Sequence, residues 1–76
     1  MKLYIGSYFS FYTRNQNHWV EIELSKPTRL TDIVSGLGIP VAEIYLVVVN
    51  NQLEETPNTI VFNDDIVRLY PAIGGG

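Results

Sequence analysis

The first third of the chain contains two runs in which apolar and polar side chains alternate. In residues 2–12 the apolar side chains of one parity are Leu3, Ile5, Phe9 and Phe11. Residues 19–24 alternate too, with glutamates between the apolar positions Val20, Ile22 and Leu24. A period of two residues predicts strands with one buried face. Because only the polar segment 14–18 separates the runs, they are expected to pair as an antiparallel hairpin.

A helical pattern follows the second run. One apolar stripe has the spacing i, i+3, i+4 and i+7 and consists of Leu30, Ile33, Val34 and Leu37. It predicts a short helix over 29–37. Thr28 is expected to be its N-cap, with the hydroxyl accepting from an amide of the first turn. Gly38 should end the helix in the left-handed conformation, and Pro40 should prevent its continuation.

The second half of the chain contains mainly strand-like segments. Residues 45–49 are apolar at every position, as expected of a strand covered on both faces. The remaining predicted features are a turn at Asn50-Asn51, a short edge strand over 52–54, an irregular segment over 55–63, a turn at 63–65, and a last strand over 66–70 closed by Pro71.

The resulting element order is β-β-α-β-β-β, which predicts an α+β fold. A single apolar helix stripe can cover only one face of a sheet. The expected arrangement is therefore a mixed sheet of four to five strands around one short helix, the β-grasp architecture of ubiquitin. We expect one domain over 1–71, followed by a flexible tail over 72–76.

Composition narrows the classes of function. The 76 residues include no cysteine, which excludes disulfides and thiolate metal sites. A net charge of −3 argues against nucleic acid as the main partner. No segment resembles a signal peptide or a membrane span, so we expect a cytoplasmic protein without a membrane partner.

One face of the predicted sheet has no helix to cover it. We expect this face to be a contiguous docking surface for a partner protein; the alternative is scattered exposed apolar side chains, which are common. With Val67 and Leu69 facing the helix, the residues predicted on the docking face are Tyr4, Val47, Val49, Arg68 and Tyr70.

The chain ends in three glycines, Gly74 to Gly76. Without Cβ atoms, this backbone could pass through a channel too narrow for side chains. The residues from Ala72 to Gly76 can reach roughly 17 Å when extended, far enough to enter a buried site. Ordering them costs about 1–2 kcal/mol each, which docking must offset. The alternative is a frayed terminus without function.

These features together resemble the ubiquitin-like sulfur carriers of the MoaD/ThiS family, and most closely the small subunit of molybdopterin synthase. The resemblance covers nearly the whole chain. The segments that carry it are Leu37-Gly38-Ile39-Pro40, Val47-Val48-Val49-Asn50, the final strand from Asp65 to Pro71, and the terminal Gly75-Gly76.

The resemblance implies a specific chemistry. A ubiquitin-activating-type enzyme would adenylate Gly76 with ATP, and the adenylate would become a thiocarboxylate. The large subunit of the synthase would then receive the sulfur for molybdenum or tungsten cofactor synthesis. Ala72, Ile73, Gly74 and Gly75 would thread into the partner's site, and the chain itself would be a carrier with no permanently bound cofactor rather than an enzyme.

Departures from the family pattern leave the pathway open. Tyr8-Phe9-Ser10-Phe11-Tyr12 lacks the arginine usual in the first strand, Asn51 replaces a glycine, and Ala72 replaces a proline. The alternatives are a carrier for thiamine thiazole or another sulfur pathway, a ubiquitin-like protein modifier, and a non-covalent β-grasp interaction module.

No catalytic or metal-binding constellation is predicted. His18 is the only histidine and has no partner ligands in the sequence. The pairs Glu54-Glu55 and Asp64-Asp65 are expected to be solvated turn residues rather than acid–base pairs. The aromatic residues of the first strand lack the basic groove that base stacking requires.

Overall fold

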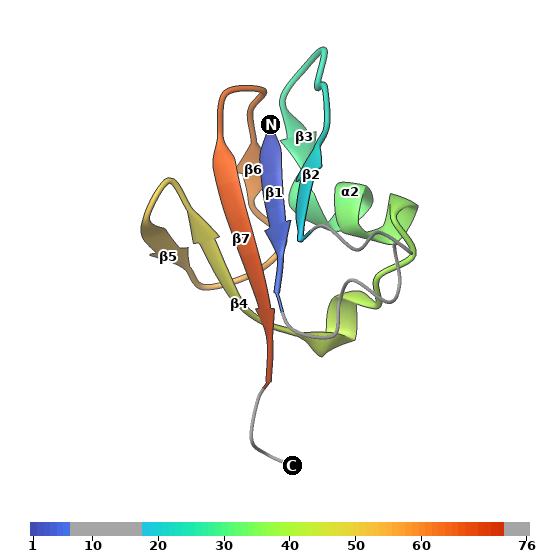
Figure 1. Cartoon of the computed structure of the whole chain (residues 1–76), viewed down its shortest axis with the longest axis vertical. Coiled ribbons are helices and arrows are strands. Elements are labelled where there is room, and N and C mark those ends of the chain that lie inside the picture. Colours follow the sequence, from blue (N-terminus) through green and yellow to red (C-terminus); the bar gives the residue numbers. More distant parts are fainter. Residues whose placement is uncertain (7–17, 73–76) are drawn as a thin grey trace.

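A mixed five-stranded sheet organises the part of the chain that the computed structural model describes, residues 1–6 and 18–72 (Figure 1). Its strands, in spatial order, are β2 (Trp19–Glu21), β1 (Lys2–Ile5), β7 (Ile66–Pro71), β4 (Ile44–Val49) and β5 (Gln52–Glu54). The central pair β1 and β7 is parallel, and the other neighbours are antiparallel. The predicted α+β class, the mixed sheet and its strand number are confirmed.

The first two strands pair as predicted. Leu3 lies opposite Val20 in the antiparallel ladder, and the Leu3 and Ile5 side chains are completely buried. The predicted continuation of the first strand to residue 12, with Phe9 and Phe11, lies outside the described residues.

The helix α2 (Leu30–Gly36) forms from the predicted apolar stripe. Leu30 and Val34 are fully buried, while the other two stripe residues pack partly buried against the core. Gly38 has a φ of 82°, so the predicted left-handed end of the helix is confirmed. A 3-10 helix, η2 (Val41–Glu43), follows Pro40.

The predicted N-cap is wrong. Arg29 occupies the cap position, and no side chain makes a capping hydrogen bond there. Thr28 instead belongs to a two-residue strand, β3 (Thr28–Arg29), and its Oγ1 donates to the Lys26 carbonyl at 2.9 Å. The first turn is satisfied in another way, because the Leu30 amide donates to the Thr59 carbonyl at 2.8 Å.

The segment 55–63 is less irregular than predicted. It contains β6 (Ile60–Val61), which pairs antiparallel with β3 in a separate two-stranded sheet. Val61 is fully buried. Two residues are too short a run to show a period in the sequence, so only the tertiary pairing defines this strand.

The orientation of β4 corrects two predictions. Val47 lies opposite Leu69 in the β4–β7 ladder and is only 2% exposed, and Val49 packs partly buried against the same core. Both valines therefore face the helix rather than the open side. The strand is also not covered on both faces, since Tyr45 is 70% exposed and Leu46 is 38% exposed.

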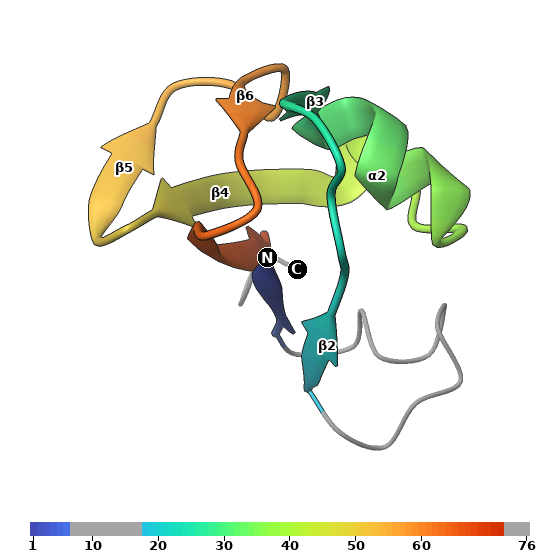
Figure 2. The same ribbon diagram turned by 90° about the horizontal axis from the view of Figure 1, so that it is seen from above.

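The core lies between the sheet and the helix. Viewed from above, α2, β3 and β6 lie on one side of the β1–β7 pair, and no described element covers its other side (Figure 2). The buried apolar side chains that fill the core include Leu3, Ile5, Leu30, Val34, Val61, Val67 and Leu69. No helix among residues 1–6 and 18–72 has the length and apolar character needed to cross a membrane.

Candidate functional site

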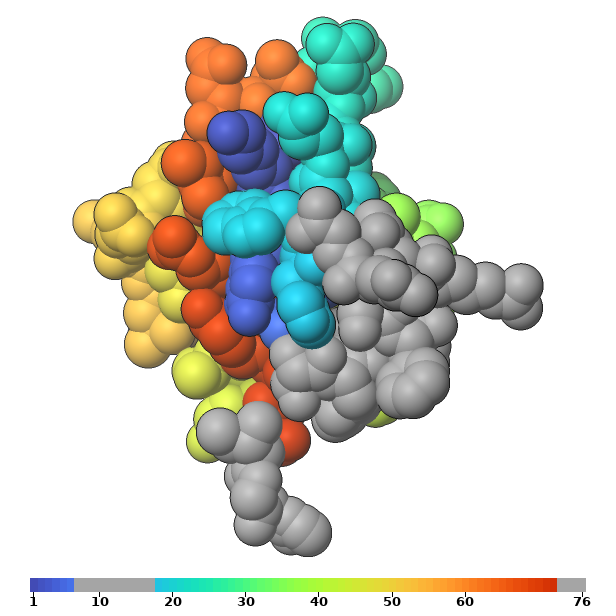
Figure 3. Space-filling model, in the orientation of Figure 1, coloured from blue at the N-terminus to red at the C-terminus, as the bar shows by residue number. Residues whose placement is uncertain are grey.

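The sheet presents one continuous surface on the side away from α2, which we call the open face. Residues directly opposite each other in a ladder share a face, so the strand registers identify its members. They are Lys2, Tyr4, Trp19, Glu21, Leu46, Val48, Leu53, Ile66, Arg68 and Tyr70. In Figure 3 the atoms of β1, β2 and β7 lie side by side on this surface, with no helix over them.

Tyr4 is the centre of an aromatic cluster on the open face. Its ring centroid lies 5.2 Å from that of Trp19 and 5.9 Å from those of His18 and Tyr70. The rings are tilted by 36° to 58°, within the range of favourable aromatic packing. Cross-strand pairing produces this cluster, because Tyr4 on β1 is directly opposite Trp19 on β2.

Arg68 adds a positive charge to the cluster. Its guanidinium carbon lies 5.7 Å from the Trp19 ring centroid, within cation–π range. Its Nη1 also donates to Asn51 Oδ1 at 3.1 Å. These contacts hold the guanidinium against the surface of the sheet, where Arg68 is half-buried.

The turn at Asn50-Asn51 makes the Arg68 contact possible. Both residues have positive φ, 50° and 68°, which asparagine adopts more readily than most residues. Asn50 ties the turn to the last strand: its Oδ1 accepts from the Ile66 amide at 2.9 Å, and its Nδ2 donates to Asp65 Oδ1 at 2.8 Å. The predicted turn is confirmed.

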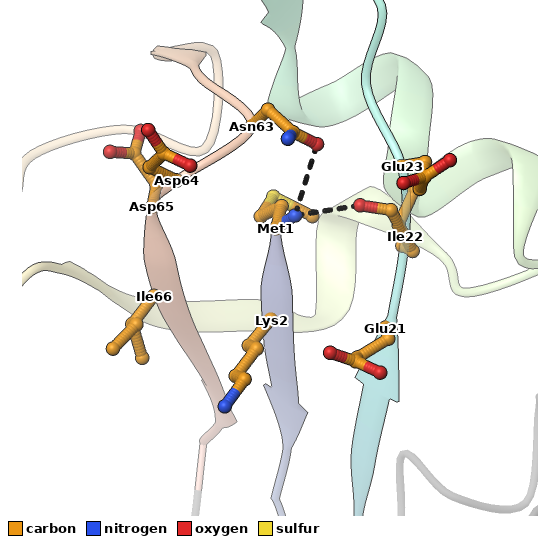
Figure 4. A pocket seen from close by; sticks show the side chains of 9 residues that line it. All are labelled: Met1, Lys2, Glu21, Ile22, Glu23, Asn63, Asp64, Asp65 and Ile66. Atoms are coloured by element: carbon orange, nitrogen blue, oxygen red, sulfur yellow. Dashed lines mark hydrogen bonds between the residues drawn. The ribbon is translucent and has the colours of Figure 1, made fainter.

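Two hollows adjoin the open face. The first, which we call the acidic hollow, has a volume of about 410 Å³ and is lined by Met1, Lys2, Glu21, Ile22, Glu23, Asn63, Asp64, Asp65 and Ile66 (Figure 4). The second, the tryptophan hollow, has a volume of about 610 Å³ and is lined by Lys2, Trp19, Val20, Glu21, Ile66 and Arg68.

Hydrogen bonds close one end of the acidic hollow. The Met1 amino group donates to the Ile22 carbonyl at 2.7 Å and to Asn63 Oδ1 at 3.4 Å. The Leu24 amide donates to the same Asn63 oxygen at 2.9 Å. Figure 4 shows Lys2 extending away from these groups, between Ile66 and Glu21.

The structure brings three of the five predicted docking residues together. Tyr4, Arg68 and Tyr70 lie on the open face, whereas Val47 and Val49 belong to the core side. The β4 residues that do reach the open face are Leu46 and Val48.

Sequence reasoning also missed Trp19 and Lys2 as members of the surface. The signal for Trp19 was present, since it precedes the inward-facing Val20 and must therefore point outward. Lys2 has the same parity as Tyr4 and could have been placed by the same rule.

Of the predicted tail, only Ala72 is described, and it is exposed. Ile73, Gly74, Gly75 and Gly76 lie outside the described residues. Ala72 directly follows the buried Pro71 at the end of β7.

The other candidate groups make local contacts. His18 Nδ1 lies 2.9 Å from the Ile5 carbonyl, and since a carbonyl oxygen only accepts, Nδ1 carries the hydrogen. Asp65 Oδ2 accepts from the Phe62 amide at 2.8 Å, and Glu54 Oε1 accepts from Thr59 Oγ1 at 3.1 Å. The described part of the chain contains no group of three or more His, Cys, Asp or Glu that could hold a metal ion.

Comparison with known proteins gives no functional assignment for this chain. No protein-family model matches the chain, and a search of curated proteins finds no match.

Proposed function

We propose that this chain is a β-grasp sulfur carrier in the cytoplasm. In this proposal Gly76 is adenylated and converted to a thiocarboxylate, which donates sulfur to molybdopterin synthesis as part of a heteromeric synthase. The chain acts as a carrier, and its partners supply the catalytic groups, ATP and the sulfur acceptor. The sheet order with β1 and β7 as a central parallel pair is compatible with this fold.

The main support for the proposal is that the open face includes the end of β7, directly before the predicted tail. Tyr70 belongs to the open face, Pro71 is the buried last residue of the same strand, and Ala72 is the first residue of the predicted tail. A partner docked on the open face would thus be next to Ala72, the first residue after β7. Such docking would offset the entropy of ordering the tail, about 1–2 kcal/mol per residue.

The proposed chemistry needs a single reactive group from this chain. The Gly76 carboxylate would attack the α-phosphorus of ATP and displace pyrophosphate, forming an acyl-adenylate. A sulfur nucleophile from a donor would then displace AMP. Activation is necessary because a carboxylate repels nucleophiles and its own leaving group would be oxide.

Intact-mass spectrometry tests the proposal. The full chain is incubated with ATP, magnesium, a sulfur donor and an adenylating enzyme of the ubiquitin-activating type. The expected product has one oxygen replaced by sulfur, located to Gly76 by fragmentation. Gly76→Ala should strongly reduce this product because a Cβ would crowd the activation channel, whereas Ala72→Gly, at the start of the tail, should not. If no thiocarboxylate forms under these conditions, the carrier proposal is wrong.

Acceptor assays separate the pathways. Transfer of the sulfur to a molybdopterin precursor supports the proposal as stated, and transfer only to a thiazole precursor redirects it to thiamine synthesis. Higher-mass protein conjugates that disappear with Gly76 would instead indicate a protein modifier. Partner binding unaffected by removal of Gly75 and Gly76 would favour a non-covalent interaction module.

A further inference from the structure

The tryptophan hollow combines positive charge with an aromatic wall. Lys2 and Arg68 both line it, together with Trp19 of the edge strand β2. The molecule as a whole has the opposite sign, with a net charge of −3. Glu21 also lines the hollow, so its two cations and one carboxylate leave it with one net positive charge, opposite in sign to the molecule as a whole.

Neither cation forms an ion pair within the described part of the chain. No carboxylate oxygen lies within 4 Å of the Lys2 ammonium or the Arg68 guanidinium among residues 1–6 and 18–72. The side-chain hydrogen bond of Arg68 goes to the neutral Asn51 amide, which does not neutralise its charge. A carboxylate from outside would therefore gain two charge-assisted interactions without breaking an existing ion pair.

The spacing of the two cations suits one carboxylate. Lys2 lies opposite Ile66, and Arg68 lies opposite Tyr4, so the two cations are diagonal neighbours on adjacent strands. With parallel strands about 4.8 Å apart and a rise of about 3.3 Å per residue, their Cα atoms are separated by roughly 8 Å. The flexible Lys2 stem and the wider Arg68 fork can both reach a carboxylate between them.

The remaining wall limits what else fits. Trp19 is 39% exposed and Ile66 is 41% exposed, so an apolar group beside the carboxylate would bury part of their solvent-exposed surface. Glu21, opposite Lys2 on β2, lines the far side and disfavours a ligand with several negative charges. These features favour a single carboxylate with an apolar neighbour over a polyanion.

We propose that the tryptophan hollow is the seat for an aspartate or glutamate side chain, flanked by an apolar residue, of a partner protein. The carboxylate binds between Lys2 and Arg68, and the apolar neighbour packs on Trp19 and Ile66. The use of this seat in docking an activating enzyme or sulfur acceptor rests on the proposed carrier function. The existence of the seat does not depend on that function.

A peptide titration of the full-length chain tests the seat directly. The ¹⁵N-labelled protein is titrated with acetyl-Leu-Asp-Leu-amide and, as the matched neutral probe, acetyl-Leu-Asn-Leu-amide, while its amide and indole NMR signals are followed. The aspartate peptide should give saturable shifts at the Trp19 indole and at the Lys2, Glu21 and Arg68 amides. Its affinity should exceed that of the asparagine peptide by roughly tenfold and fall as salt is added.

Charge-removal variants provide the control. The double variant K2Q/R68Q should lose the preference for the aspartate peptide, and K2Q alone, at an exposed position, should lose part of it. K26Q removes the same charge from an exposed turn away from the hollow and should keep the full preference. Equal binding of the two peptides, shifts located elsewhere, no saturable shifts, or an unaffected double variant would each overturn the seat. A failure here leaves thiocarboxylate formation at Gly76 unaffected, so the two proposals fail separately.

Discussion

The two faces of β7 differ sharply in burial and surroundings, although they share one backbone. Val67 and Leu69 are fully buried against the helix side. Arg68 and Tyr70, between and after them, belong to the open face and its aromatic cluster. One strand thus builds the core on one side and a candidate binding surface on the other.

We expect the helix side of the sheet to determine stability and the open face to determine recognition. A solvated sheet face normally carries polar side chains, but the open face carries two tyrosines, a tryptophan and four aliphatic residues. Substitutions on the helix side should therefore lower the free energy of unfolding. Those on the open face should mainly change binding.

The largest expected difference comes from removing the same side chain on each face. Leu69→Ala should lower the free energy of unfolding by about 2–5 kcal/mol, because it leaves a cavity in the core. Leu46→Ala, at a position that is 38% exposed, should cost less than about 1.5 kcal/mol. Urea unfolding of both variants measures the contrast, and similar losses would mean that Leu46 is also a core residue.

A Cβ added at Gly6 should crowd side chains of the open face and the backbone of β7. It would lie 3.1 Å from Tyr4 Cε2 and 3.2 Å from both the Leu69 carbonyl oxygen and Tyr70 Cδ1. Gly6→Ala should cost about 1–3 kcal/mol through overpacking. Gly36→Ala is the matched control: beyond its chain neighbours and its own helix backbone, no atom of residues 1–6 and 18–72 lies within 4 Å of the added Cβ, and it should stabilise α2 by up to about 1 kcal/mol. Thermal unfolding of the pair should show shifts of opposite sign.

Adjacent valines test the orientation of β4. Val47→Thr buries a hydroxyl in the core and should cost about 1–3 kcal/mol. Val48→Thr places the same hydroxyl on the open face, opposite Arg68, and should change stability by less than about 0.5 kcal/mol. Equal losses in denaturant unfolding, or a larger loss at Val48, would contradict the β4–β7 register.

A smaller loss of stability than at Val47 is expected at Arg68. Arg68→Gln removes the cation from the Trp19 ring and should cost about 0.5–1 kcal/mol. It should also change the Trp19 fluorescence, the single tryptophan signal of the chain. Lys26→Gln, an exposed charge removal elsewhere, should leave that emission unchanged. An emission spectrum of Arg68→Gln identical to that of the parent would argue against the cation–π contact.

Local pattern predicted most of the elements. The stripe beginning at Leu30 defined α2, the alternation around Val20 defined β2, and Asn50-Asn51 defined a turn whose residues have positive φ. These features depend on neighbours within a few positions, so the sequence contains their signal. The Thr28 cap failed because pairing with Val61 in β6 placed Thr28 in a strand instead.

The candidate site depended on information that local pattern lacks. The valine run gave no period, and either parity could have faced the helix. The antiparallel register of β4 with β7 chose Val47 for the core and Leu46 and Val48 for the open face. The hollow shared by Lys2, Trp19 and Arg68 likewise joins three strands and appears in no single segment.

The sequence by itself determined the α+β class, the order of the principal elements, the apolar stripe of the helix and the outward parity of Tyr4 and Tyr70, because each follows from spacing along the chain. The tertiary structure decided which valines are buried, that β3 and β6 exist, and that Lys2 and Arg68 line one hollow beside Trp19. Those outcomes depend on strand register, a one-residue shift of which moves every side chain to the opposite face.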